Sequence, residues 1–344
     1  MSIRLSNLSP ALPPALLQNL SAINIKTAAD LVFIPPDALL HSLPRGSTTL
    51  GELESCIDNV TGQVAAEGMS GDELLASEVA SDLTEVKSGV SELDELIGGS
   101  FSGTHGGNVI EISGKSGTGK TALALHTVLS HLSQHGRDAA IWMDTTGDLS
   151  AQRLTHAMSS QAGPCTDTAL ERLHISLAFE IEAAYDILDN IRSVLTSTSS
   201  SDARPRILVI DTITPLLGPN LSATSSQGHA AMTTFMRSLR TLARTHALFI
   251  LVLNSSTVSN TNSASAFAWT THKPALGPSF TFLTDATLWL ARPPPSALNP
   301  TSSAADDHDG DSDRDQQELR IAEVLRSRIS VCSFIATVSI RSAE

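Results

Sequence analysis

Eight consecutive residues of this 344-residue chain have the types and spacing of a phosphate-binding loop. They are Gly114, Lys115, Ser116, Gly117, Thr118, Gly119, Lys120 and Thr121. The pattern G-x-x-x-x-G-K-[ST] needs glycines because consecutive backbone N–H groups must face phosphate oxygens, and the helix that follows adds its positive dipole end. We therefore expect these residues to bind ATP, with Lys120 on the β- and γ-phosphates and the Thr121 hydroxyl on Mg²⁺.

A carboxylate at the end of an apolar run is the second candidate for this chemistry. Asp211 directly follows the run at residues 207–210, which reads as a buried strand. In proteins with a phosphate loop, such a carboxylate holds the water shell of the metal. Apolar strands often end in aspartate for other reasons, so the prediction that Asp211 completes an ATP and Mg²⁺ site depends on the phosphate loop before it.

The elements that must position these residues follow from an alternation of apolar patterns after Lys87. Strand-like runs are expected at 109–113, 139–144, 206–211 and 247–254, and amphipathic helices at 121–136, 183–195 and 232–246. This alternation predicts an α/β fold with a mostly parallel sheet flanked by helices on both faces. After Asp285 the runs are strand-like only, which predicts an antiparallel extension of one edge of the sheet.

Composition divides the chain into three segments. Residues 1–62 show helical leucine periodicity interrupted by prolines, which predicts a small N-terminal helical domain. Residues 63–84 are rich in Ala, Gly and acidic residues, which is typical of a linker with room for one short helix. Residues 85–344 form the predicted core, with a Pro-, Ser- and Asp-rich insertion at about 293–318 that we expect to be disordered.

Charge, cysteines and hydropathy exclude several classes of protein. The formal net charge is −14, so the whole surface cannot be a basic nucleic-acid-binding surface, and any contact with DNA must be local. Cys56, Cys165 and Cys332 are isolated, which supports neither a disulfide framework nor a zinc site and favours a reducing compartment. The longest apolar run, 247–253, is far shorter than the roughly 20 residues that cross a bilayer. Residues 1–14 lack the apolar centre of a signal peptide, so we expect a soluble protein that is not secreted.

Several motifs resemble the core of the RecA/Rad51 recombinase family. They are Ser88-Gly89-Val90, Leu93-Asp94, Leu96-Ile97-Gly98-Gly99, the phosphate loop, Asp144 with Gly147, and Arg153-Leu154. The resemblance implies a RecA-like ATPase core preceded by a small helical domain, as in the eukaryotic and archaeal branch. Within that branch, residues 8–32 and 273–277 are most similar to the D-type paralogue of the eukaryotic strand-exchange protein.

The resemblance also identifies two departures from active members of the family. There the strand ending at Asp144 continues D-T-E-G, and the glutamate positions the water that attacks the γ-phosphate, whereas this chain has Thr146. A threonine hydroxyl is not a useful base near neutral pH, and a positioned general base is typically worth about 10²- to 10⁴-fold. Asp148 is the alternative base, although it lies beyond Gly147 and also fits a solvated loop acid. We therefore expect slow hydrolysis.

The second departure lies after the strand at 247–254, where active members have a glutamine that senses the γ-phosphate. Ser255 occupies that place, so the nucleotide-dependent DNA switch is expected to be weakened. The two segments that the resemblance identifies as DNA loops, 217–228 and 255–272, contain no Lys or Arg. Arg237, Arg240 and Arg244 form one basic stripe on the following helix, which suits either contact with DNA or a partner, or an ordinary solvated helix face.

Two further basic residues match family positions. The resemblance implies that the Arg153 guanidinium lies against adenine, and a planar cation suits stacking on a base; the alternative is a surface arginine at the start of a helix. Lys273 ends the second DNA loop, where the family sets residues of one subunit against ATP held by its neighbour. It is either a cation supplied in trans or an exposed loop lysine.

The resemblance implies a nuclear protein of homologous recombination and DNA double-strand break repair. It would bind ATP with Mg²⁺, join other recombinase paralogues in a hetero-oligomer, and help to load or stabilise the recombinase on single-stranded DNA, with weak binding to single-stranded or branched DNA by itself. Residues 63–84 contain no F-x-x-A motif, which disfavours a filament of this chain alone. Two alternatives stay open: an active DNA-dependent ATPase with its own strand-exchange filament, and a scaffold whose ATP binding is vestigial.

Overall fold

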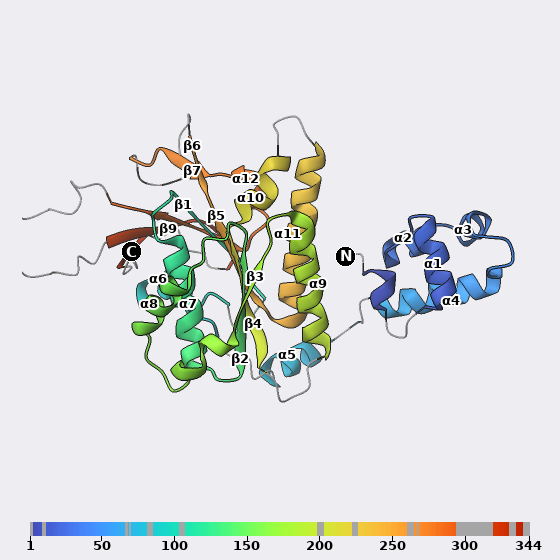
Figure 1. Ribbon diagram of the computed structural model, residues 1–344, viewed down its shortest axis with the longest axis horizontal. Helices are drawn as coiled ribbons and strands as arrows, with labels where there is room; N and C mark the ends of the chain where they lie inside the picture. Colours follow the sequence, from blue (N-terminus) through green and yellow to red (C-terminus); the bar gives the residue numbers. More distant parts are fainter. Residues whose placement is uncertain are drawn as a thin grey trace, which may run out of the picture. The chain divides into compact units, whose positions relative to one another are not determined.

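The computed structural model describes most of the chain, and its two units are described separately. The described residues are 3–8, 12–65, 68, 70–80, 85–102, 107–197, 203–221, 226–259, 265, 267, 269–293, 319–329 and 335–339. The units are Met1–Ser81 and Asp82–Glu344 (Figure 1). The predicted acidic insertion lies, from residue 294 to residue 318, outside the described residues.

Five α-helices build the first unit. They are α1 (Pro14–Ala22), α2 (Ala28–Val32), α3 (Pro36–Ser42), α4 (Leu50–Val64) and α5 (Gly71–Ala80), after a short 3₁₀ turn, η1 (Leu5–Asn7). Pro14 and Pro36 are the first residues of α1 and α3, where the missing N–H costs nothing. Thr27 and Thr49 cap α2 and α4 in capping boxes completed by Asp30 and Glu52. The predicted linker thus contains α5.

The second unit is built on one eight-stranded sheet of order β10-β9-β8-β1-β5-β4-β2-β3. Its strands are β1 (Val109–Gly114), β2 (Asp138–Asp144), β3 (Leu173–Leu177), β4 (Arg204–Asp211), β5 (Phe249–Asn254), β8 (Ala286–Ala291), β9 (Leu319–Ser327) and β10 (Ile335–Ser339). In this sheet the six neighbouring strands β3, β2, β4, β5, β1 and β8 pair in parallel. Beyond β8, strands β9 and β10 pair antiparallel. The predicted α/β fold with an antiparallel extension is therefore confirmed.

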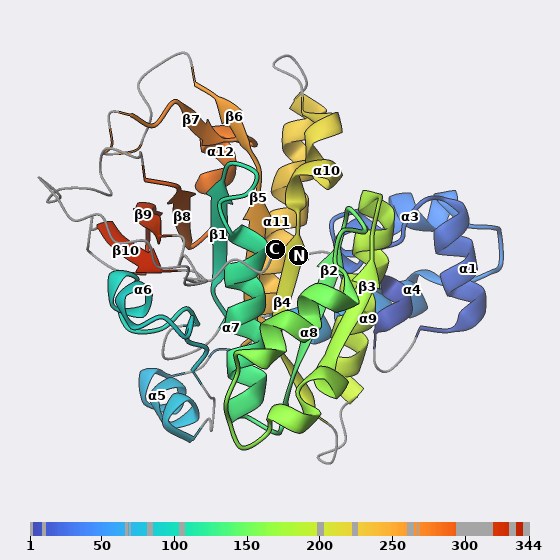
Figure 2. The same ribbon diagram turned by 60° about the vertical axis from the view of Figure 1, so that its left-hand side comes forward.

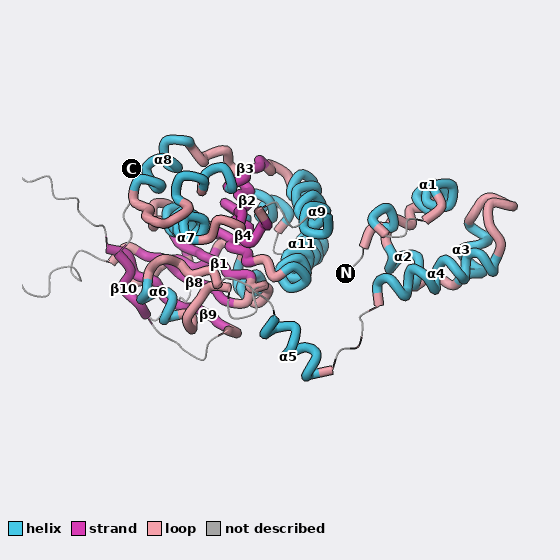
Figure 3. The backbone as a smooth tube through the Cα atoms, turned by 90° about the horizontal axis from the view of Figure 1, so that it is seen from below, coloured by secondary structure: helices cyan, strands magenta, loops and turns pink. Residues whose placement is uncertain are grey.

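Helices cover both faces of this sheet (Figure 3). One face carries α6 (Ser91–Leu96), α7 (Lys120–Gln134) and α8 (Ala151–Ser159), and the other carries α9 (Ile181–Ser197), α10 (Ile213–Leu217), α11 (Ser226–His246) and α12 (Gly277–Thr281). The 3₁₀ turns η2 (Thr166–Thr168), η3 (Leu170–Arg172) and η4 (Gly218–Asn220) complete the connections. Each face of the sheet packs against its helices in a separate hydrophobic core. Alternate residues of β5 point into the two cores: Phe249, Leu251 and Leu253 lie in one, and Ile250 and Val252 in the other.

The parallel strands bring the sites predicted from the sequence to one edge of the sheet. Asp144 of β2 lies opposite Asp211 of β4, and Ser113 of β1 lies opposite Asn254 of β5. A small hairpin of β6 (Ser256–Val258) and β7 (His272–Pro274) follows β5 at the same edge (Figures 1 and 2). Ligands of open α/β sheets bind outside the carboxyl ends of the strands, so this edge is where a site is expected.

No helix in the described part of the chain is both long enough and apolar enough to cross a membrane. The longest described helix, α11, has 21 residues.

The first unit has a small core and should respond sharply to a cavity. Leu53 is fully buried within it, so Leu53→Ala should lower its free energy of unfolding by roughly 2–5 kcal/mol. That loss is comparable with the whole stability of a small domain. Limited proteolysis combined with thermal unfolding should detect early loss of the first unit, while the transition of residues 82–344 is retained.

The matched control is Glu54→Ala, which changes an exposed neighbour on the same helix. Equal destabilisation of both units by Leu53→Ala would show that they do not unfold separately.

Candidate nucleotide-binding site

The phosphate loop connects β1 to α7 through backbone that only glycine adopts without strain. Gly117 and Gly119 have φ angles of 75° and 92°, in the left-handed region. A Cβ on Gly114 would lie 2.5 Å from the carbonyl oxygen of Leu290 in the neighbouring strand β8. The glycines of the motif therefore serve two purposes: two allow the turn, and one allows β8 to pass close to the loop.

Lys120 lies inside the curve of this loop. Its Nζ donates to the carbonyl oxygens of Gly114 and Lys115, both at 2.9 Å, and the residue is only 9% exposed. Burial lowers the pKa of the Lys120 ammonium, and the nearby charge of Asp211 opposes this shift. A phosphate held by the loop would offer oxygens to the same ammonium, which is the role that the motif predicts.

Thr121 and Asp211 meet across the end of the sheet. The Thr121 hydroxyl donates to Asp211 Oδ2 at 3.0 Å, so the end of β4 is fixed to the first turn of α7. Burial raises the pKa of Asp211 to about 6; the charge of Asp144 adds to this, while the Thr121 hydrogen bond, Lys120 and Arg153 oppose it. Hydroxyl and carboxylate oxygens are the ligands that Mg²⁺ prefers, and a bound cation would favour the ionised aspartate. The donor set therefore fits Mg²⁺.

The turn after β2 is organised around Asp144. Its Oδ1 accepts from the backbone N–H groups of Thr146 and Gly147 at 2.9 and 2.8 Å and from the Thr146 hydroxyl at 3.2 Å, and its Oδ2 accepts from Leu149 N–H at 3.1 Å. Burial works to raise the pKa of Asp144, but these hydrogen bonds prevail and lower it. Thr145 ties the turn to β4, because its hydroxyl donates to Thr212 O at 2.6 Å and accepts from Thr212 N–H at 2.8 Å.

The two candidates for the hydrolytic position, Thr146 and Asp148, both lie in the turn after β2. Thr146 is exposed, and its hydroxyl is engaged as a donor to Asp144. Asp148 is exposed too, and its side chain makes no hydrogen bond or ion pair within the described part of the chain. Arg153 lies in the first turn of α8, where Ser150 caps the helix; the guanidinium is exposed yet close enough to lower the pKa of Asp211.

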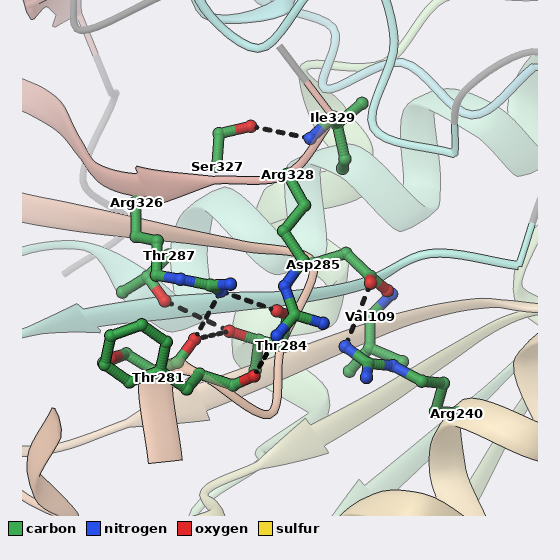
Figure 4. Close-up of polar contacts among 11 residues, drawn as sticks. Val109, Arg240, Thr281, Thr284, Asp285, Thr287, Arg326, Ser327, Arg328 and Ile329 are labelled. Carbon is green, nitrogen blue, oxygen red and sulfur yellow. Dashed lines mark hydrogen bonds and ion pairs between the residues drawn. The ribbon is translucent and has the colours of Figure 1, made fainter. Parts of the chain in front are cut away.

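The predicted basic stripe on α11 needs a correction at Arg240. Arg237 and Arg244 are exposed, but Arg240 Nη2 lies 3.1 Å from Asp285 Oδ1 (Figure 4). Asp285 is at the same time fixed to β1, since its Oδ2 accepts from Val109 N–H at 2.9 Å. The ion pair fastens α11 to the amino ends of β1 and β8, and leaves two free guanidiniums for any contact with DNA or a partner.

Lys273, the other basic candidate, lies in β7 and is partly buried there. It pairs with Thr257 of β6 and is followed by the turn that leads into α12. It therefore lies in the pair of strands β6 and β7 at the carboxyl edge of the sheet.

A buried polar network beneath the site was missed by the sequence patterns. Glu111 is fully buried in β1, and its carboxylate accepts from Asn254 Nδ2 at 2.7 Å, Ser113 Oγ at 2.6 Å and Thr287 Oγ1 at 2.9 Å. Asn254 Oδ1 in turn accepts from the Thr214 hydroxyl at 2.9 Å. This network joins β1, β5, β8 and α10. Its one signal in the sequence is a glutamate inside an otherwise apolar strand.

Burial raises the pKa of Glu111, and its three hydrogen bonds oppose the shift. The ordinary value, 4.5, applies in the unfolded chain, so the folded state holds this proton more tightly and loses stability as pH rises from about 4.5 through the raised pKa. Glu111→Gln removes this loss. The free energy of unfolding of the variant, measured by urea unfolding from pH 4.5 to 8, should therefore improve relative to that of the unmodified protein as pH rises.

Glu54→Gln, at an exposed position, supplies the control for the change of net charge. A difference between Glu111→Gln and the unmodified protein that stays constant with pH would contradict the assignment.

The chain is similar to known proteins of one family. The Rad51 family model matches residues 80–292. DNA repair protein RAD51 homolog 4 of Bos taurus is 27% identical over 293 residues, covering 84% of this chain and 85% of the relative. The protein of the same name from Mus musculus is 25% identical over 293 residues, covering 84% of each.

Among solved structures, the crystal structure of the RadB recombinase matches with a TM-score of 0.51 and 21% identity. It covers 73% of this chain and 94% of that structure. At this identity the likeness concerns the fold alone. The family model, in contrast, spans more than half of the chain and includes the phosphate loop, the turn after β2 and the end of β4. The chain therefore belongs to the Rad51 family.

Proposed function

We propose that this chain is an ATP-binding recombinase paralogue of the D type that acts in homologous recombination and DNA double-strand break repair. It works in the nucleus as a subunit of a heteromeric complex, and the complex helps to load or stabilise the strand-exchange recombinase on single-stranded DNA. One observation carries the proposal: Lys120, Thr121 and Asp211 form an intact site for Mg-ATP, whereas Thr146 takes the place of the family's catalytic glutamate. The names of its relatives from Bos taurus and Mus musculus support the role in DNA repair.

The arrangement around Asp144 explains why hydrolysis should be slow. A general base must have a free lone pair within hydrogen-bond reach of the attacking water. The Asp144 carboxylate already accepts four hydrogen bonds, three of them from backbone N–H groups, which also lower its pKa. Thr146 contributes only a hydroxyl, and that hydroxyl donates to Asp144. ATP therefore serves mainly as a ligand that holds the site, and a partner subunit packed on it, in one conformation.

An open edge of the sheet suits assembly with a different subunit. Among the strands that the structure describes, β3 has a sheet neighbour on one side only, β2. Ile175, Leu177 and Phe179, at alternate positions along this edge, are 47%, 57% and 59% exposed. An extended segment of another subunit could add to β3 through main-chain hydrogen bonds and cover these side chains. The edge therefore supports the hetero-oligomeric part of the proposal.

Restoring the missing carboxylate tests the proposed cause of slow hydrolysis. Thr146→Glu should raise the turnover of Mg-ATP at least tenfold, because a positioned base is typically worth about 10²- to 10⁴-fold. Steady-state phosphate release with and without single-stranded DNA measures it. Asp148→Asn should leave the slow turnover of the unmodified chain unchanged. Brisk, DNA-stimulated hydrolysis that Asp148→Asn abolishes would instead make Asp148 the base and the chain an active ATPase.

Removing the ammonium from the loop tests the role of ATP in assembly. Lys120→Ala should weaken Mg-ATP binding by roughly 10- to 100-fold, since hydrogen bonds to charged groups contribute about 1.5–3 kcal/mol. If ATP holds a partner subunit in place, less partner should co-purify from cells, whereas Lys26→Ala, at an exposed position of the first unit, should change neither result. Loss of ATP binding with unchanged co-purification would favour a scaffold with vestigial ATP binding.

A further inference from the structure

Three side chains of metal-binding types meet at the end of α7 that is remote from the phosphate loop. His131 lies in the last turn of α7, His135 caps that helix, and Asp138 is the first residue of β2. One imidazole nitrogen from each histidine and one carboxylate oxygen all lie within 4.8 Å of one another. The helix has 15 residues, so the cluster is about 22 Å along its axis from the phosphate loop. It contains none of the isolated cysteines that argued against a zinc site.

His131 and Asp138 already face each other as two ligands of one ion would. The distance from His131 Nε2 to Asp138 Oδ2 is 2.8 Å, and the side chains are only 1% and 12% exposed. A tetrahedral metal ion at about 2.0–2.2 Å from each atom holds them roughly 3.4 Å apart. An opening of roughly 0.6 Å therefore lets an ion lie between them, with the His131 proton on Nδ1.

The third side chain is oriented by its own helix. His135 Nδ1 lies 3.0 Å from the carbonyl oxygen of His131. A carbonyl oxygen only accepts, so Nδ1 carries the proton and Nε2 keeps a free lone pair. Histidines that bind metal typically donate their other ring N–H in this way. The half-buried His135 ring stacks on His131, with ring centroids 4.3 Å apart, and rotation of this ring brings Nε2 to the ion.

Arg172 fixes the backbone that carries these ligands. Its Nη1 donates to the carbonyl oxygens of His135 and Asp138, both at 2.7 Å, and its Nη2 donates to Leu132 O at 2.6 Å. The turn between α7 and β2 is thus tied down at three carbonyl groups. A site whose backbone is held in place before binding loses less conformational freedom when it takes up a ligand.

The charges around the cluster determine which metal suits it. A cation at the C-terminal end of a helix is favoured by the helix dipole. The guanidinium of Arg172 opposes a cation, and so does that of Arg206, which lies close enough to Asp138 for the carboxylate to raise its pKa against the larger effect of burial. Mg²⁺ and Ca²⁺ prefer oxygen ligands and depend on negative charge. Zn²⁺ instead binds neutral imidazole together with a carboxylate, which is the donor set present here.

We propose that His131, His135 and Asp138 form a zinc site, with solvent as the fourth ligand beside the half-buried His135. The ion fastens the end of α7 to the start of β2. Because α7 begins at the phosphate loop and β2 ends at Asp144, zinc bound at the amino edge of the sheet also fixes the two elements that carry the nucleotide site at the carboxyl edge. The inference goes beyond the proposed function and does not depend on it.

The test uses the purified full chain, first stripped with a chelator and then titrated with Zn²⁺ in excess Mg²⁺, which occupies oxygen sites. Atomic absorption after gel filtration should find about one zinc per chain, and competition with a chromophoric chelator gives the affinity. His135→Gln and Asp138→Asn should each weaken zinc binding by at least about 10- to 100-fold, a loss typical even of groups that only support a ligand. Zinc should raise the Tm of the unmodified chain, because it binds the folded state.

Matched controls separate this site from other metal-binding groups. His156→Gln removes an exposed histidine of α8, and Cys165→Ser removes a thiol that lies beside Gly136 in the turn before β2. Both variants, and Lys120→Ala, should bind zinc as the unmodified chain does. Circular dichroism of His135→Gln and Asp138→Asn checks that both variants remain folded.

Three results would overturn the zinc site. They are no stoichiometric zinc on the unmodified chain, undiminished affinity in folded His135→Gln, and loss of zinc in Cys165→Ser. In the first case the cluster is only a buried ion pair of His131 with Asp138. In the third case the metal has a different ligand set. Weakened Mg-ATP binding in Lys120→Ala with zinc retained would show that the two sites are independent.

Discussion

The parallel register of β1, β5, β4 and β2 brings the polar residues at the ends of these strands together at the candidate nucleotide site. Because these strands end together, Thr121 at the start of α7 is within 3.0 Å of Asp211, and Asp144 stands opposite Asp211. Parallel strands of this kind are buried on both faces, so their ends are the first places where polar side chains reach solvent. The same arrangement requires a glycine at position 114, because β8 passes so close to the loop that a side chain there would have no room.

Two carboxylates share this edge, and the protein stabilises them in different ways. Asp144 is held ionised by backbone N–H donors, which fixes the turn that follows β2. Asp211 is left with a raised pKa, because burial and the charge of Asp144 outweigh its contacts with Thr121, Lys120 and Arg153. A glutamate at position 146 would add a third negative charge beside them. The neutral Thr146 avoids that repulsion.

Local patterns predicted the parts of the site that depend on local geometry. The loop from Gly114 to Thr121 was found because its glycines and lysine have fixed spacing, and the apolar runs correctly predicted the sheet that positions it. Strand β3 was missed, because Leu173–Leu177 is short and has exposed apolar residues on an edge, where hydrophobic alternation is weak. The partner of Arg240 was missed because Asp285 is 45 residues away, and helical periodicity carries no information about such a contact.

The grouping of Trp269, Trp289 and Arg292, which line one cavity, could not be predicted from the sequence either, because it also depends on contacts between distant parts of the chain. It depends on β8 returning beside β1, and pairings between distant strands leave no trace in the spacing of residues. Glu111 gave a clearer signal, since a carboxylate inside an apolar strand must find hydrogen-bond donors when it is buried. Its donors come from three strands, so a glutamate in an apolar strand could at most have indicated that donors exist, without showing which residues they are.

The open side of β3 affects how this protein must be handled in the cell. A solvent-exposed edge strand with apolar side chains offers a template to any other extended chain, and proteins usually blunt such edges with charges, prolines or short length. Strand β3 is short, but it carries neither charge nor proline, and Ile175 and Leu177 are exposed on it. Newly made copies that find nothing to cover them are exposed to self-association and to the chaperones and proteases that remove such species. If the proposed heteromeric assembly covers this strand, the steady amount of this chain should follow the supply of the subunit that does so.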